Sequence, residues 1–192
     1  MTSSNSTIWL ATLCDSLVSY RRMIDATVVQ LSDAELFSRP GTEFNSVAVI
    51  LRHLGGNLRS RWTDFLTTDG EKPDRNRDTE FQDWEGDRAS LLGYFDSGWR
   101  KFESVFDQLD DTNIEQVIYI RGESHTIPQA LNRSLTHVAY HAGQIAIVAR
   151  MVHAGDWKWL TIAPGTSAKF NKDAWGTSAS RSVFADDKDA DR

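Results

Sequence analysis

Four segments of the sequence carry apolar residues at steps of three and four, and this period constrains the fold more than any other feature. The segments span residues 6–31, 46–67, 87–109 and 128–154. A helix with that spacing has one apolar stripe, which must be buried against another element. Four such helices with short to medium connections predict an all-α four-helix bundle.

Local signals place two helix starts and one hairpin. Asn45 is a suitable N-cap for the second helix, and Pro128 suits the first turn of the fourth. Residues 116–120 form a run of β-branched and aromatic residues, Arg121-Gly122-Glu123 could turn the chain, and residues 125–127 could form the returning strand. This pattern predicts a small β-hairpin between the third and fourth helices.

The second helix has two further features that bear on packing. Gly55-Gly56 lies inside it, at a cost of about 1 kcal/mol per glycine relative to alanine, which predicts that another element packs closely there. The connection that follows, residues 69–85, is highly charged and is expected to be a surface segment.

Composition indicates one domain of ordinary globular balance. The 192 residues are 40% hydrophobic and 25% charged, with a net charge of −6 and a pI near 5.3. An acidic chain is expected to bind neither nucleic acid nor anionic membrane, which favour basic surfaces. The single cysteine, Cys14, excludes an intrachain disulfide and favours a cytoplasmic location. We assign residues 1–170 to the bundle domain and 171–192 to a polar C-terminal tail.

Three of the five histidines form a candidate metal site. His137 and His141 are four residues apart on the fourth helix, so they lie within about 40° of each other on one face. His53 lies on the flank of the second helix, where it would face them if the two helices are neighbours. Three imidazoles suit Zn, Ni, Cu or Fe(II), and three protein ligands leave one coordination position open.

An alternative interpretation is that these histidines are ordinary residues at the edge of the core, because an HxxxH pair alone is a weak signal. The other two histidines have no such partners. We expect His125 to belong to the hairpin and His153 to lie at a solvated helix end.

The segments around the three histidines are NSVAVILRHLGGNLRSRW and LTHVAYHAGQI. In these motifs and in helix order the chain resembles the DinB/YfiT-like metal-binding four-helix bundle superfamily. The segment NLRSRWTDFLTTDGEKP is similar to an uncharacterised branch of it, whose members carry a domain of unknown function. The resemblance implies that His53, His137 and His141 are ligands of a zinc or nickel ion, and that the protein is a homodimer.

The resemblance also implies a chemistry, since characterised relatives are commonly thiol transferases that act on a small-molecule substrate. A low-molecular-weight thiol would be the second cofactor, because a cation deprotonates a coordinating thiol. The alternatives are a metal-dependent hydrolase, which activates water instead, and a non-catalytic metal-binding or dimeric scaffold protein.

No catalytic residue can be assigned from the sequence. Asn57 and Gln144 are candidate cofactor-binding amides that orient a ligand or the substrate, although both positions also suit ordinary polar residues at the core edge. Asp64 is on the correct flank for a general base but is far along the helix axis. Tyr140 is expected to point about 100° away from His141.

Three arginines of the second helix, Arg52, Arg59 and Arg61, leave two interpretations open. They could bind an anionic substrate, but their spacing spreads them around the helix and favours solvated faces. Arg61 lies near the apolar stripe, so we expect it to pack its stem there or to meet a carboxylate.

Overall fold

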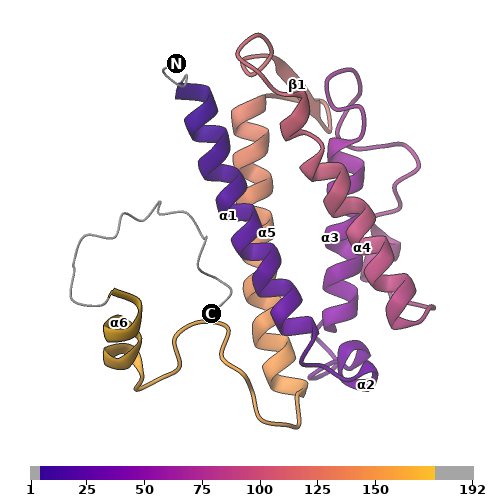
Figure 1. Ribbon diagram of the computed structural model, residues 1–192. Coiled ribbons are helices and arrows are strands. Elements are labelled where there is room, and N and C mark those ends of the chain that lie inside the picture. Colours follow the sequence, from indigo (N-terminus) through magenta and orange to yellow (C-terminus); the bar gives the residue numbers. More distant parts are fainter. Residues whose placement is uncertain (1–4, 176–192) are drawn as a thin grey trace. The chain divides into compact units, whose positions relative to one another are not determined.

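The computed structural model describes residues 5–175 of the chain, which are mostly helical (Figure 1). The four long helices are α1 Asn5–Val28, α3 Val47–Trp62, α4 Arg88–Glu103 and α5 Ile127–Val152. The shorter elements between them are α2 Asp33–Phe37, the 3-10 helices η1 Asp78–Phe81 and η2 Phe106–Gln108, and the strands β1 Val117–Ile120 and β2 Glu123–Thr126. The predicted helical class and the predicted hairpin are confirmed.

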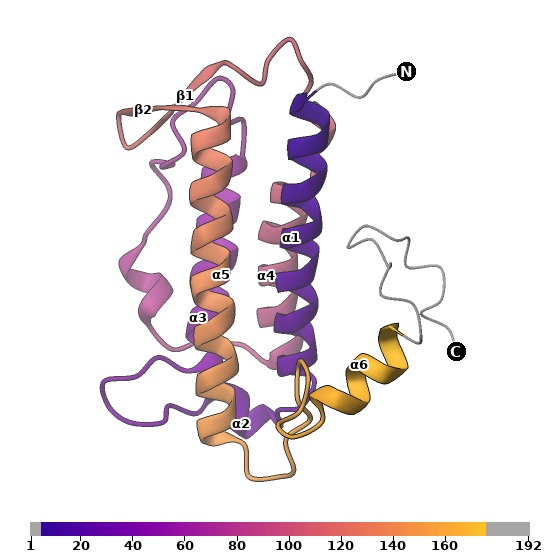
Figure 2. The ribbon, with the colours of Figure 1, turned by 90° about the vertical axis from the view of Figure 1, so that its left-hand side faces the viewer.

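The long helices belong to one compact unit, Met1–Trp157. Within it α1 lies beside α5, α3 lies beside α4, and α3 also contacts α5 (Figure 2). Helices α1 and α5 run in one direction, and α3 and α4 run in the opposite direction. The chain must therefore return along the molecule between α3 and α4, and residues 63–87 make this return.

A second unit, Lys158–Arg192, contains the helix α6 Ser167–Trp175, which the sequence pattern did not predict. Residues 176–192 of the predicted polar tail lie outside the described residues. Among the described helices, none is long and apolar enough to cross a membrane.

The apolar stripes of the four long helices meet in a single core. The largest fully buried side chains include Ile24 of α1, Leu51, Leu54, Leu58 and Trp62 of α3, Phe95 and Phe102 of α4, and Leu131 of α5. Each lies on the stripe that the three- and four-residue period predicts, so burial of these stripes explains why the four helices associate.

Both the first and the last residue of α3 differ from the prediction. The N-cap is Ser46, whose side chain accepts a hydrogen bond from the Val49 N–H, so the prediction of Asn45 is wrong by one residue. The helix ends at Trp62, before the predicted end near residue 67. Asp64 adopts a left-handed backbone with φ of 47°, which an α-helix cannot continue through.

The hairpin has a two-residue turn, because Glu123, which was expected in the turn, is the first residue of β2 and pairs with Ile120. Val117 pairs with Thr126 in the antiparallel ladder, and the turn residues Arg121 and Gly122 have φ of 55° and 76°. Two consecutive residues with positive φ match the twist of the flanking strands. The Asp69 carboxylate accepts hydrogen bonds from the N–H groups of both turn residues, at 2.8 Å each, which joins the hairpin to the connection after α3.

The predicted close packing at the glycine pair involves two different neighbours. A Cβ atom on Gly98 of α4 would overlap the backbone carbonyl of Gly55, so the two helices touch through their main chains there. A Cβ atom on Gly56 would overlap the carboxylate of Glu80. Gly55 therefore allows α4 to approach α3, and Gly56 leaves space for a buried acidic side chain.

Replacing Gly98 with alanine should destabilise the protein by about 1–3 kcal/mol, because the new methyl group meets backbone that cannot rotate away. The matched control is Gly93→Ala on the same helix, where a Cβ atom would meet nothing within 4 Å. That variant should lose no stability, since alanine favours a helix over glycine. Urea unfolding of both variants measures the difference, and equal stability would contradict the main-chain contact.

Candidate metal centre

The structure brings the three candidate histidines together. His53 of α3 and His137 of α5 face each other with their Nε2 atoms 3.2 Å apart, and Nε2 of His141 lies 3.1 Å from Nε2 of His137. One ring nitrogen of each histidine lies within 4.8 Å of the others, so the cluster could hold a metal ion. The cluster forms because α3 and α5 are neighbours, as the sequence argument required.

His53 is oriented by a buried carboxylate. Its Nδ1 atom lies 2.8 Å from Oε2 of Glu80, and Arg75 donates hydrogen bonds of 2.8 Å to both oxygens of that carboxylate. Burial alone would raise the pKa of Glu80, but the hydrogen bonds from His53 and Arg75 outweigh it and hold the pKa below its usual value. An ionised carboxylate only accepts, so Nδ1 of His53 carries a hydrogen, and in the neutral ring Nε2 then presents a lone pair to the cluster.

The His141 ring is also oriented by a hydrogen bond at Nδ1, here to a residue of the same helix, α5. Its Nδ1 atom lies 2.7 Å from Oε1 of Gln144, whose amide nitrogen donates to the hydroxyl of Tyr140 at 2.9 Å. The amide oxygen accepts, so Nδ1 of His141 carries the hydrogen and Nε2 presents a second lone pair. Gln144 thus orients one candidate ligand, and its predicted role in cofactor binding stays a prediction.

His137 stands between these two lone pairs. A single N–H at its Nε2 atom can be directed at only one of the two neighbouring nitrogens, which leaves the other contact of 3.1 or 3.2 Å between two acceptors. A cation at this point would satisfy all three nitrogens at once. The donor set and its orientation therefore fit a transition metal ion.

The electrostatic environment keeps the α5 histidines neutral. Burial, together with His141 and His53, lowers the pKa of His137 to about 3. Burial and His53 lower the pKa of His141 to about 4, although the hydrogen bond that its ring donates to Gln144 acts in the opposite direction. Neutral imidazole is the form that binds a metal ion, so these ligand atoms are available at neutral pH.

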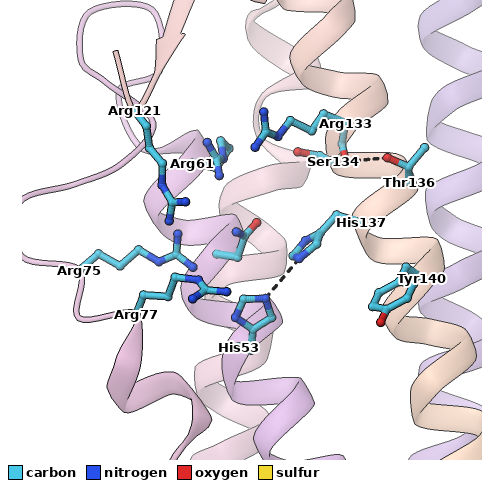
Figure 3. A pocket seen from close by; sticks show the side chains of 11 residues that line it. His53, Arg61, Arg75, Arg77, Arg121, Arg133, Ser134, Thr136, His137 and Tyr140 are labelled. Atoms are coloured by element: carbon cyan, nitrogen blue, oxygen red, sulfur yellow. Dashed lines mark hydrogen bonds between the residues drawn. The ribbon is translucent and has the colours of Figure 1, made fainter. Parts of the chain in front are cut away.

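A cavity of about 370 Å³ opens beside the cluster (Figure 3). Two of the three histidines line it, His53 and His137, and so do Asn57 and Tyr140. Within the described residues, no fourth histidine, cysteine or carboxylate joins the three-nitrogen group. A ligand in the cavity would therefore lie next to any open coordination position.

Of four other residues that the sequence analysis singled out, two line the cavity and two do not. Asn57 is buried and lines the cavity. Tyr140 was expected to point away from His141, but its ring lies 5.0 Å from the His141 ring and lines the same cavity. Asp64 is exposed and does not line this cavity, so it is not positioned as a general base there. His125 lies in β2, as expected.

His153 differs from the expectation of a solvated helix end. It follows α5, its side chain is only 13% exposed, and it lies 3.2 Å from a Glu35 oxygen and against Trp157. Packing against Glu35 and Trp157 therefore replaces the predicted solvent contact.

Sequence reasoning missed Glu80 and Arg75. Both lie in the charged connection, residues 69–85, that was expected to be a surface segment, and nearly all of that connection is exposed or half-buried. Glu80 is nevertheless only 4% exposed, on η1, and Phe81 beside it stacks on the His53 ring at 4.8 Å. The one available signal was the glycine pair, which indicated a close neighbour without identifying it.

A family model described as "Protein of unknown function (DUF1572)" matches residues 4–166, which is most of the chain. The chain belongs to the DUF1572 family. No curated protein matches this DUF1572 sequence.

One solved structure is similar to the DUF1572 chain. It is described as the crystal structure of a conserved protein from Enterococcus faecalis, with a TM-score of 0.57 and 17% sequence identity. The match covers 79% of the DUF1572 chain and 98% of the other chain. At this identity the likeness shows a shared fold and nothing about activity.

The lowered pKa values predict how stability depends on pH in the metal-free protein. His137 and His141 bind fewer protons when folded than when unfolded between pH 6.5 and about 4, so the free energy of unfolding should fall as the pH drops through that window. Chemical unfolding at a series of pH values measures this. A His137→Gln variant should show a shallower decline, and an identical decline in both proteins would contradict the assigned pKa of His137.

Proposed function

We propose that this chain binds one divalent transition metal, zinc or nickel, through His53, His137 and His141, and that it is an enzyme acting on a small molecule. We further propose that the fold is a four-helix bundle of the DinB/YfiT-like type and that the reaction is transfer of a thiol. The observation that carries the proposal is the convergence of three Nε2 atoms, two of which are fixed as lone-pair donors by Glu80 and Gln144.

A bound divalent ion would supply Lewis acidity, which lowers the pKa of a thiol or a water at its remaining coordination position. The protein supplies the rest. Glu80 and Gln144 hold two of the imidazoles in the productive tautomer, and such partners strengthen metal binding. The hydroxyl of Tyr140 accepts from Gln144, so its own hydrogen is available to a ligand in the cavity.

The residues around the cavity favour thiol transfer over hydrolysis. Hydrolysis usually requires a general base near the attacking water. Among the described residues that line the cavity none is acidic, and Glu80 is already occupied by His53 and Arg75. A thiol that loses its proton on coordination needs no such base. The homodimer implied by the family resemblance stays a prediction.

The first test is metal content by mass spectrometry on the purified, untagged protein. We expect about one zinc or nickel ion per chain, lost in a His137→Ala, His141→Ala double variant because two of three ligands are gone. A His125→Ala variant is the control and should keep its metal. Glu80→Gln should weaken metal affinity by about 10–100-fold, since a neutral amide is a weaker acceptor for the Nδ1–H of His53 than the carboxylate it replaces. Absence of metal in the wild type after incubation with zinc and nickel would disprove the site.

The second test addresses the thiol. Protein loaded with Co(II) in place of the native metal should develop a sulfur-to-metal charge-transfer absorption when 2-mercaptoethanol is added, because the open position accepts the thiolate. The His137→Ala, His141→Ala variant should give no such band. Normal metal content with no spectral response to the thiol would reject thiol transfer and leave the hydrolase alternative.

A further inference from the structure

Five arginines line the cavity beside the histidine cluster, and no acidic residue is among its lining residues (Figure 3). They come from separate parts of the chain: Arg61 from α3, Arg75 and Arg77 from the 63–87 connection, Arg121 from the hairpin turn and Arg133 from α5. Like charges gathered in one place repel one another. The chain as a whole has a net charge of −6, so this local excess of positive charge does not reflect its composition.

Two of the five arginines are paired with carboxylates of the protein. Arg75 binds Glu71 at 2.9 Å and both oxygens of Glu80 at 2.8 Å. Arg121 lies 3.3 Å from the same oxygen of Glu71 that Arg75 contacts. Glu71 and Glu80 therefore pair with Arg75 and Arg121 and do not neutralise the other three arginines of the cavity.

Arg77 and Arg133 are exposed and have weaker partners. The Arg77 guanidinium lies over the Phe81 ring at 5.0 Å, and Nη1 of Arg133 lies 3.3 Å from Nε2 of His125. Within the part of the chain that the structure describes, neither forms an ion pair with an acidic residue. Solvent screens these two charges, so they add to the field of the cavity at little cost in stability.

Arg61 is different because it is buried. Its side chain is one of the few buried charged groups, the residue is only 6% exposed, and its Nη1 atom has no hydrogen-bond partner in the described structure. Burial, together with Arg133 and Arg75, lowers its pKa to about 10. The sequence analysis expected Arg61 to pack its stem or to meet a carboxylate, and no carboxylate of residues 5–175 forms an ion pair with it. A buried cationic group with an unsatisfied N–H is costly, and Arg61 lines this cavity, where a ligand could supply the missing acceptor.

We propose that this cavity binds the carboxylate or phosphate group of a small-molecule substrate, with Arg61 as the buried anchor. The proposal deepens the proposed function, on which it rests for the reaction at the histidines. A guanidinium fork matches both oxyanions and forms strong charge-assisted hydrogen bonds with them. The anion would supply the partner that Arg61 lacks.

The dimensions of the site favour a small molecule over a nucleic acid. A volume of about 370 Å³ suits a metabolite-sized ligand. His137 lines this cavity and also belongs to the histidine cluster. A ligand anchored by its anionic group at Arg61 would therefore extend toward the cluster, where its reacting group would meet the metal.

The test compares Arg61→Met with Arg59→Met in the full-length, metal-loaded protein. Arg59 is on the same helix but is exposed, and its guanidinium lies over the Tyr94 ring outside this cavity. Binding of inorganic phosphate and of succinate is measured by calorimetry against sodium chloride of equal ionic strength. We expect saturable binding of at least one anion to the wild type, weakened about tenfold or more by Arg61→Met and unchanged by Arg59→Met.

A second readout separates binding from folding. Without an anion, Arg61→Met should melt at the same or a higher temperature than the wild type, since it removes a buried unpaired charge. If that variant does not fold, Arg133→Met replaces it, because Arg133 is exposed and lines the same cavity. Preference for phosphate or for succinate identifies the class of anion.

Failure of this inference is distinguishable from failure of the metal site, because the metal content of every protein is measured alongside. Metal at one ion per chain with no saturable anion binding would overturn the anion site and leave the metal proposal intact. Anion binding that depends on Arg61 in a protein without metal would reject the metal proposal and keep the anion site. Anion binding that is equal in the wild type and Arg61→Met would also overturn the inference.

Discussion

Two adjacent glycines allow other parts of the chain to approach α3 from two sides at the same level. At Gly55 the main chain of α4 comes into contact through Gly98, and at Gly56 the carboxylate of Glu80 occupies the space of the missing side chain. The first contact sets the distance between α3 and α4. The second allows Glu80 to reach His53, which lies one turn before. Helix packing and the orientation of a candidate ligand therefore depend on the same short stretch of backbone.

This arrangement explains why glycine is used where it weakens the helix. Each glycine costs about 1 kcal/mol relative to alanine. The close contact between α3 and α4, and the buried chain of hydrogen bonds from Arg75 through Glu80 to His53, offset that cost. A helix with better intrinsic propensity would hold its neighbours farther away and would leave the imidazole without its acceptor.

Features with a regular period could be predicted from the sequence, and features that depend on a single long-range contact could not. The helices followed from apolar stripes such as that of Leu51, Leu54 and Leu58, and the hairpin from its β-branched residues and the expected turn at residues 121–123. The three histidines were found because an i, i+4 pair shares a face and because a flank position implies a neighbouring helix.

The missed features have identifiable reasons. Glu80 and Arg75 lie in a connection whose composition is that of a surface loop, and no local pattern distinguishes a buried acidic residue from an exposed one. The short helix α2 was missed although Ser32 and Glu35 form a capping box, because five residues are too few to show a period. The burial of Arg61 without a carboxylate could not be foreseen, since a stripe position predicts burial of the stem but not the absence of a partner.

The histidine cluster consists of one local part and one distant part. His137, Tyr140, His141 and Gln144 lie within two turns of α5, so their contacts arise as soon as that helix forms. His53 reaches Glu80 across 27 residues of sequence and His137 across 84. Closing loops of this length costs conformational entropy, which is offset only when the helices pack together. We therefore expect Nε2 of His53 to join the two α5 histidines late in folding, so that the complete cluster forms only with the complete tertiary structure.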